Sequence, residues 1–385
     1  MIVRFLKILG VNALIFLGLL LLLEAAGQIV AKVRPSYDVL YMMPDKVVGW
    51  KPAPNIRFTW AGAEWYASDF SVDIKTNSHG FLDRARETAK PQSVTRIAVL
   101  GDSFIEAAQV PRHHTATQLL EQLLNAAPER AARRSQKWEV LNFGVSNYGV
   151  GQYLLAWEEY ASKFSPDYVA IFVAKYHMGR TIHKYSWGAF TATKNDRLWI
   201  RPTFRMENGF LVREPARDFE KFVRVQQDLL KSEFGGNISR RKPPRLLTLH
   251  YARLMWRELK PELKKLLGRA DIKMSRGPEG EMIALNLKII EDLGRSVSVA
   301  GGKLVVLDAS QYFKDHEAVS RQLNEFCAKH GFGYVPVYQD LLKANANGIA
   351  TRWNFDTHFN EAGNMILAAA LYEWVAQNAL AANFQ

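Results

Sequence analysis

A serine stands directly after an apolar run in "RIAVLGDSFIEAAQVP", where Gly101, Asp102 and Ser103 join a buried strand to a helix-forming stretch. A serine at such a junction is exposed at the top of a sheet. It also lies near a helix N-terminus, whose partial positive charge favours a developing anion. Gly-Asp-Ser is also a common turn, and Ser103 could instead be only a helix N-cap. The motif therefore allows a nucleophile at Ser103 without requiring one.

A second motif near the end of the chain could activate that serine. "RWNFDTHFNEAGN" places Asp356 and His358 just before a closing amphipathic helix. A serine hydroxyl needs a base to become a nucleophile, and the base needs an acid that fixes its tautomer. The alternative is that His358 and Asn360 serve only as capping and turn residues. The nucleophile candidate and the acid and base candidates are expected at the same edge of the sheet. The two motifs therefore favour nucleophilic catalysis, which needs no metal or organic cofactor.

The elements that would position these residues alternate between strands and helices from Arg96 onward. Apolar runs predict strands at 96–100, 138–143, 167–174, 303–309 and 333–337, and amphipathic stretches predict helices at 114–127, 151–164, 281–301, 316–331 and 361–381. Such alternation indicates right-handed βαβ units and a parallel sheet covered on both faces. The site then lies beyond the carboxyl ends of the strands.

Before and within this pattern, the chain changes character. The sequence predicts five parts, namely a signal anchor or transmembrane segment (1–35), a strand- and turn-rich extension (36–95), a first catalytic part (96–183), a basic and mainly helical insertion (184–276) and a second catalytic part (277–385). By count, the insertion holds 22 Lys and Arg against 10 Asp and Glu, which matches the net charge of +12 of all 385 residues. It is either a helical cap with solvated charges or a surface that attracts anionic lipid or acidic polysaccharide.

The N-terminus carries 16 uncharged residues between Lys7 and Glu24. This is slightly short for a membrane span and slightly long for a signal-peptide core. No clean cleavage site precedes Gln28, so we expect an uncleaved, single-pass anchor with the remaining chain on the extracytoplasmic (periplasmic) side. On that side of the membrane nucleic acid is an improbable partner. The single cysteine, Cys327, excludes an internal disulfide, and its apolar surroundings indicate a buried side chain.

The motifs together resemble those of the SGNH (GDSL-type) hydrolases. "GDS" resembles the family's first block, with Ser103 as nucleophile, and "VLNFGVSNYGVGQ" its second, with Gly144 lending an N–H to the oxyanion hole. "DTH" resembles the fifth block, which supplies Asp356 as acid and His358 as base. "TNSHGFLDRARE" is similar to a segment of members with an N-terminal extension. The resemblance implies a three-layer α/β/α fold with a flavodoxin-like parallel sheet.

Two departures from the family pattern bear on function. The Asp-His spacing is one residue shorter than usual, and the third-block asparagine is missing from "IFVAKYHMGR". That asparagine would donate a hydrogen bond to the oxyanion, and losing such a donor typically costs about 10²–10³ in kcat. Lys175 is the expected substitute, with Ser103 and Gly144 as the other donors, unless Lys175 points to solvent. Tyr176 and His177 could be substrate-contact or packing residues.

The resulting prediction is an extracytoplasmic serine esterase or acylhydrolase acting on an ester of a glycan or lipid. One alternative is an O-acyltransferase of a surface polysaccharide, in which a sugar hydroxyl resolves the acyl-enzyme. The other is a catalytically silent module that binds glycan or lipid. The sequence leaves the acyl group, the alcohol and the oligomeric state open.

Overall fold

The computed structural model describes most of the chain in two units. One unit comprises residues 1–39 and 229–276, and the other comprises residues 40–228 and 277–385. The described residues are 2–33, 41–61, 69–126, 137–183, 185–186, 199–216, 219–232, 246–249, 252, 256, 279–313 and 316–380.

The larger unit is built on a five-stranded parallel sheet with the order β13-β12-β7-β5-β6. Its strands are β5 (Val94–Gly101), β6 (Lys137–Gly144), β7 (Tyr168–Val173), β12 (Lys303–Asp308) and β13 (Gly333–Val335). Every residue of β5 is buried, as expected for a central strand of a sheet covered on both faces. The chain moves outward from β5 to β6 and then returns to β7, so the direction of strand addition reverses between β5 and β7. Sheets of this kind bind ligands at that switch point.

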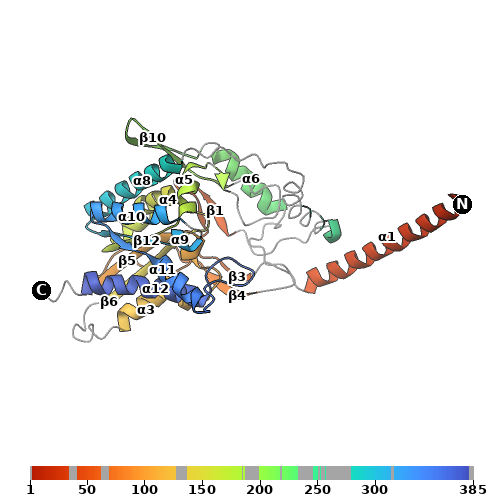
Figure 1. Ribbon diagram of the computed structural model, residues 1–385, viewed down its shortest axis with the longest axis horizontal. Coiled ribbons are helices and arrows are strands. Elements are labelled where there is room, and N and C mark those ends of the chain that lie inside the picture. Colours follow the sequence, from red (N-terminus) through yellow and green to blue (C-terminus); the bar gives the residue numbers. More distant parts are fainter. Residues whose placement is uncertain are drawn as a thin grey trace. The chain divides into compact units, whose positions relative to one another are not determined.

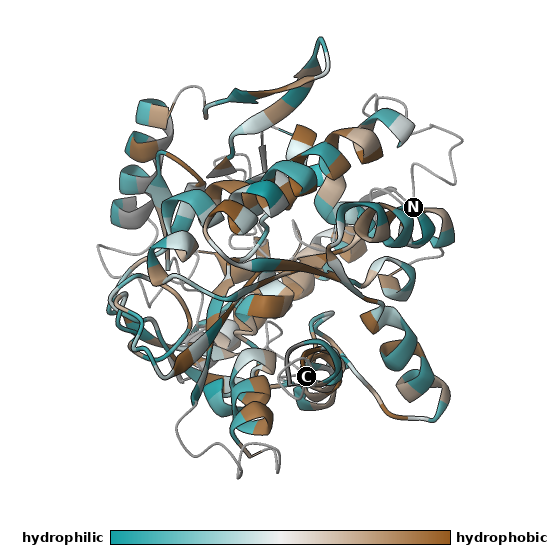
Figure 2. Cartoon of the chain, turned by 90° about the vertical axis from the view of Figure 1, so that its left-hand side faces the viewer, coloured by the Kyte–Doolittle hydropathy of each residue, from teal (hydrophilic) through white to brown (hydrophobic). Residues whose placement is uncertain are grey.

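Helices cover both faces of this sheet (Figure 1). One layer contains α3 (Ala116–Ala126), α11 (Val337–Ala346) and α12 (Glu361–Val375), and the other contains α4 (Val150–Glu159), α8 (Glu279–Val299) and α10 (Glu317–His330). Apolar residues concentrate on the strands in the middle of the unit (Figure 2). The predicted three-layer α/β/α fold is therefore confirmed.

The segment that precedes the sheet forms two antiparallel strand pairs. They are β1 (Met42–Asp45) with β2 (Gly49–Pro52), and β3 (Arg57–Ala61) with β4 (Ser71–Lys75). Buried Trp50 donates its indole N–H to the Ser146 carbonyl at 3.1 Å, and the Tyr148 hydroxyl donates to the Trp50 carbonyl at 2.5 Å. The extension thus packs against the loop that follows β6, at the carboxyl end of the sheet.

Where the structure describes the basic insertion, it contains both strands and helices. Residues 199–214 contain β9 (Trp199–Ile200) and an antiparallel hairpin of β10 (Thr203–Glu207) and β11 (Phe210–Glu214). The hairpin turns at Asn208 and Gly209, whose φ angles of 50° and 80° suit a type I′ turn. Helix α6 (Phe219–Ser232) follows. Most of the predicted basic helix from 240 onward lies outside the described residues.

The smaller unit contains the N-terminal helix α1 (Ile2–Val33). Its segment Lys7–Ile29 is 23 residues long, has a mean hydropathy of 2.3 and is not buried by other residues. These properties suit a membrane span and a signal sequence equally well. In the same unit the Glu24 carboxylate accepts the backbone N–H groups of Leu247 and Thr248 at 2.9 and 2.8 Å. This contact joins the apolar helix to the second half of the insertion.

Candidate active site

The turn that carries Ser103, the predicted nucleophile, begins at Gly101, where β5 ends. A Cβ on Gly101 would overlap Ile105 Cγ1, so only glycine lets the chain turn this tightly into α2 (Ser103–Glu106). Asp102 caps this helix, since its Oδ1 accepts the backbone N–H of Phe104 at 3.1 Å. Ser103 is therefore not the N-cap, and its hydroxyl remains available for other contacts. Because α2 is a single turn, the dipole at its N-terminus is small.

Ser103, His358 and Asp356 are brought together although 255 residues separate the first two. His358 Nε2 lies 2.8 Å from Ser103 Oγ, and His358 Nδ1 lies 2.5 Å from Asp356 Oδ1. The carboxylate cannot donate when ionised, so Nδ1 carries the proton and Nε2 can accept one from the serine. Burial acts to raise the pKa of Asp356, but hydrogen bonding and charge from His358 outweigh it and hold that pKa below its usual range. The arrangement has the geometry of a Ser-His-Asp triad.

A carboxylate that the sequence analysis did not single out holds the loop that carries the acid and base. Asp69 Oδ2 accepts the backbone N–H groups of Phe355 at 2.6 Å and Asp356 at 3.0 Å. Next to it, the rings of Phe70 and Trp353 lie 5.6 Å apart between centroids. The extension before β5 therefore orients the far end of the chain. No motif marks Asp69, because its partners are backbone groups 286 residues away.

The Asp102 carboxylate is fully buried beside the nucleophile and is held from α5 (Lys175–Ile182). Arg180 Nη1 donates to Asp102 Oδ2 and to the Tyr148 carbonyl, both at 2.9 Å. His177 Nε2 lies 2.8 Å from the same Asp102 oxygen, and its Nδ1 accepts the Ala174 N–H at 3.0 Å. Burial lowers the pKa of His177, which favours the neutral ring with its proton on Nε2. Burial opposes the charge of Asp102 as well, yet contacts with His177 and Arg180 keep its pKa below the usual range.

The predicted oxyanion donor Gly144 is engaged elsewhere. Its N–H donates to Asn142 Oδ1 at 2.8 Å, so it is not directed at the nucleophile in this structure. A Cβ at this position would overlap the Glu106 backbone nitrogen. The glycine is thus needed because α2 packs closely against the end of β6, which is a structural reason. Ser103 N–H donates to none of the described residues and remains a predicted donor.

The prediction that Lys175 replaces the missing asparagine is not supported either. Lys175 Nζ lies 2.5 Å from Glu279 Oε1 of α8, so its ammonium is engaged in an ion pair in this structure. Tyr176 lies closer to the nucleophile turn, because its hydroxyl donates to Asp102 Oδ2 at 3.3 Å. Its ring also packs 5.1 Å from that of Phe313. The third-block segment therefore supports Asp102, and the oxyanion role of Lys175 remains a prediction.

Glu106, the last residue of α2, is a fully buried carboxyl group that the sequence analysis also missed. Its Oε2 accepts the backbone N–H of Ser146 at 3.0 Å and also the Ser146 hydroxyl. Burial raises the pKa of Glu106 to about 7, although hydrogen bonds from Ser146 and Tyr41 and the charge of His358 act in the opposite direction. A carboxyl group close to the triad therefore titrates near neutral pH.

Within the described ranges, no group of three or more His, Cys, Asp or Glu side chains could hold a metal ion. Cys327 is buried on α10, as predicted, and burial raises its thiol pKa to about 12.

No protein-family model matches the chain, and no curated protein sequence matches it significantly. Several solved structures are similar in fold at low identity. TesA is 12% identical with a TM-score of 0.39, and the match covers 74% of this chain and 99% of that chain. Axe2, an acetylxylan esterase from Geobacillus stearothermophilus, is 12% identical with a TM-score of 0.38 over 73% of this chain and 94% of its own. A GDSL-like lipase from Parabacteroides merdae is 12% identical with a TM-score of 0.38, covering 77% and 100%. These are distant likenesses in fold, and the function proposed next rests on the residues of this chain.

Proposed function

We propose that this protein is a serine esterase of the SGNH (GDSL) type that works through an acyl-enzyme. The observation that carries the proposal is the pair of contacts from His358, at 2.8 Å to Ser103 Oγ and at 2.5 Å to Asp356 Oδ1. The 2.8 Å contact lies within the range over which a general base can take the proton of a nucleophile, and the 2.5 Å contact orients that base. Two further contacts support the proposal. Asp102 caps the helix that begins at Ser103, and Asp69 anchors the loop that carries Asp356, so both hold the reacting residues in place without reacting themselves.

In the proposed reaction Ser103 Oγ attacks the ester carbonyl carbon and its proton passes to His358 Nε2. The tetrahedral oxyanion accepts a hydrogen bond from the Ser103 backbone N–H. The Gly144 N–H could donate a second hydrogen bond to the oxyanion only after it gives up its hydrogen bond to Asn142 Oδ1. The bond between the acyl carbon and the alcohol oxygen then breaks, which leaves the acyl group on Ser103 Oγ, and the departing alkoxide takes the proton from His358. Water attacks the acyl-enzyme with His358 again as base, which releases the carboxylic acid and restores Ser103.

We further propose that the ester belongs to a glycan or a lipid outside the cytoplasm. The support is the apolar segment Lys7–Ile29, which is long enough to cross a membrane and lies close to the N-terminus. A short N-terminal tail inside the cell would leave the larger unit on the extracytoplasmic side. A reporter protein that is active only in the cytoplasm, fused to the C-terminus, should then be inactive.

The decisive experiment is labelling of the full-length protein, in detergent, with a fluorophosphonate. Wild-type protein and a Ser162→Ala control, altered at an exposed serine hydroxyl, should both be labelled, whereas Ser103→Ala should not. Labelling that survives Ser103→Ala refutes the nucleophile assignment. Folded wild-type protein that resists labelling would favour the silent binding module instead. Adding an acceptor sugar to a reaction with an activated acetyl ester separates hydrolysis from acyl transfer, because only a transferase forms the acetylated sugar.

A further inference from the structure

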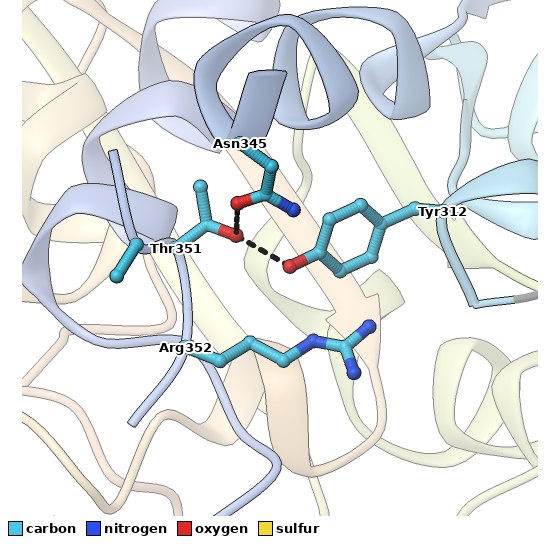
Figure 3. A pocket seen from close by; sticks show the side chains of 5 residues that line it. Tyr312, Asn345, Thr351 and Arg352 are labelled. Carbon is cyan, nitrogen blue, oxygen red and sulfur yellow. Dashed lines mark hydrogen bonds between the residues drawn. The ribbon is translucent and has the colours of Figure 1, made fainter. Parts of the chain in front are cut away.

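We propose that a cavity beside the catalytic loop binds a carboxylate-bearing sugar unit of the substrate, an inference that rests on the proposed esterase function. The cavity has a volume of about 330 Å³, at the small end of the range for ligand sites. Its lining residues come from α9 (Ser310–Phe313), the end of α11 and the loop that leads to His358 (Figure 3). They are Tyr312, Asn345, Ala350, Thr351 and Arg352.

Arg352 supplies the charge of this cavity. Its guanidinium carbon lies 4.3 Å from the centroid of the Tyr312 ring and 4.8 Å from that of Phe313, so the two aromatic rings hold the side chain in place. Among the described residues, no carboxylate lies within ion-pair distance of this guanidinium, and Nε has no hydrogen-bond partner. The planar guanidinium matches a carboxylate in shape and charge. An anionic ligand would therefore give Arg352 an ion-pair partner that none of the described residues supplies.

The neighbouring polar groups also favour an acceptor-rich ligand. Thr351 Oγ1 donates to Asn345 Oδ1 at 2.9 Å, which uses its single proton, so the Tyr312 hydroxyl must donate to Thr351 (Figure 3). This chain of hydrogen bonds fixes the Asn345 amide and leaves its NH₂ group as a donor. Among the described residues, none that lines the cavity is acidic. One positive charge with an amide donor suits a monoanionic carboxylate next to hydroxyl groups better than a dianionic phosphate.

The position of the cavity connects it to the triad. Arg352 forms a backbone bridge with Phe359, the residue after His358, and the Trp353 N–H donates to the His358 carbonyl at 3.2 Å. On the other side, the Phe313 ring packs 4.9 Å from that of Phe104, which follows Ser103. The cavity and the nucleophile thus share one loop and one aromatic contact.

Binding can be tested without turnover on the full-length Ser103→Ala protein in detergent. Calorimetry should detect glucuronate, while glucose should bind at least about tenfold more weakly, since a hydrogen-bonded charge pair contributes roughly 1.5–3 kcal/mol. Adding Arg352→Met should abolish the difference, and Arg352→Lys should restore part of it. Arg295→Met, which removes an exposed arginine of α8, is the matched control and should keep the preference. Equal binding of glucose 6-phosphate and glucuronate would overturn the carboxylate assignment.

Kinetics then connect the cavity to the reaction. The ratio of kcat/KM for acetylated glucuronate to that for acetylated glucose should be about ten or more in the wild type and should approach one in Arg352→Met. A wild-type ratio near one, without glucuronate binding, overturns this inference and leaves the esterase intact. Arg352-dependent glucuronate binding without hydrolysis of either ester refutes the proposed function and leaves the cavity's ligand standing. Should Arg352→Met unfold, the ratio in Arg352→Lys decides, because a retained charge must retain part of the preference.

Discussion

The buried carboxyl group of Glu106 should make the stability of the larger unit fall as the pH rises. Burial raises the pKa of Glu106 from 4.5 to about 7, so the folded state favours the neutral carboxyl. Between these two values the unfolded chain releases its proton and the folded chain keeps it, and raising the pH therefore favours unfolding. At ~1.4 kcal/mol for each tenfold difference in proton affinity, the loss amounts to about 3 kcal/mol once the pH exceeds 7. Below about pH 4.5 the loss is absent.

Glu106→Gln should remove this dependence. Glutamine keeps an oxygen that can accept both donors of Ser146 but has no proton to release in this range. We expect the free energy of unfolding of the variant, relative to the wild type, to increase by about 3 kcal/mol between pH 4 and pH 8. Urea denaturation followed by tryptophan fluorescence measures this difference. The exposed Glu325→Gln is the control, and a Glu106→Gln difference that stays constant over the range would refute the reasoning.

Three substitutions test the catalytic assignments by steady-state kinetics on an activated acetyl ester. Asp356→Asn should lower kcat by about 10⁴ with little change in KM, because His358 loses the partner that fixes its tautomer, and a loss under tenfold would contradict the triad. Asp69→Asn should lower kcat by roughly tenfold, since a neutral amide oxygen is a weaker acceptor for the Phe355 and Asp356 N–H groups, and unchanged kcat would mean the loop holds itself. Lys175→Met should change kcat by less than about threefold, because its ammonium pairs with Glu279 at the surface. A hundredfold loss would restore the oxyanion role that the sequence suggested.

The sheet could be predicted from the sequence because parallel strands buried on both faces are continuous apolar runs. The predicted strand at 96–100 is the middle of β5 (Val94–Gly101), and the one at 303–309 matches β12 to one residue. The run "GYVPV" was predicted as one strand, but the strand ends at Val335 and Pro336 caps the unpredicted helix α11. A proline has no N–H to donate to a neighbouring strand, so the sequence does indicate that the strand ends before Pro336. The Asn208-Gly209 pair likewise signals the hairpin that the basic composition of the insertion concealed.

The contact between Ser103 and His358 could be predicted for a different reason. The topology brings the carboxyl ends of the strands to one edge, so the place of Ser103 and His358 follows from the order of elements alone. The direction of a single N–H or ammonium group does not. Gly144 N–H is captured by Asn142, and the Lys175 side chain is drawn to a carboxylate on α8, more than a hundred residues later. Arg180 and Asp69 act on backbone carbonyl and N–H groups, which leave no pattern in sequence spacing.

The contact between Asp69 and the loop of Asp356 has a consequence for how activity appears and disappears. It joins positions 286 and 287 residues apart, so it can form only after the sheet has brought the two ends of the chain together. The segment that carries Asp69 and the loop that carries Asp356 then hold each other in place. Mild denaturation should break this contact before the sheet unfolds, since loops held by few hydrogen bonds open at lower free energy than buried strands. The proposed esterase activity should therefore be gained last on folding and lost first, and an enzyme assay should register damage that circular dichroism misses.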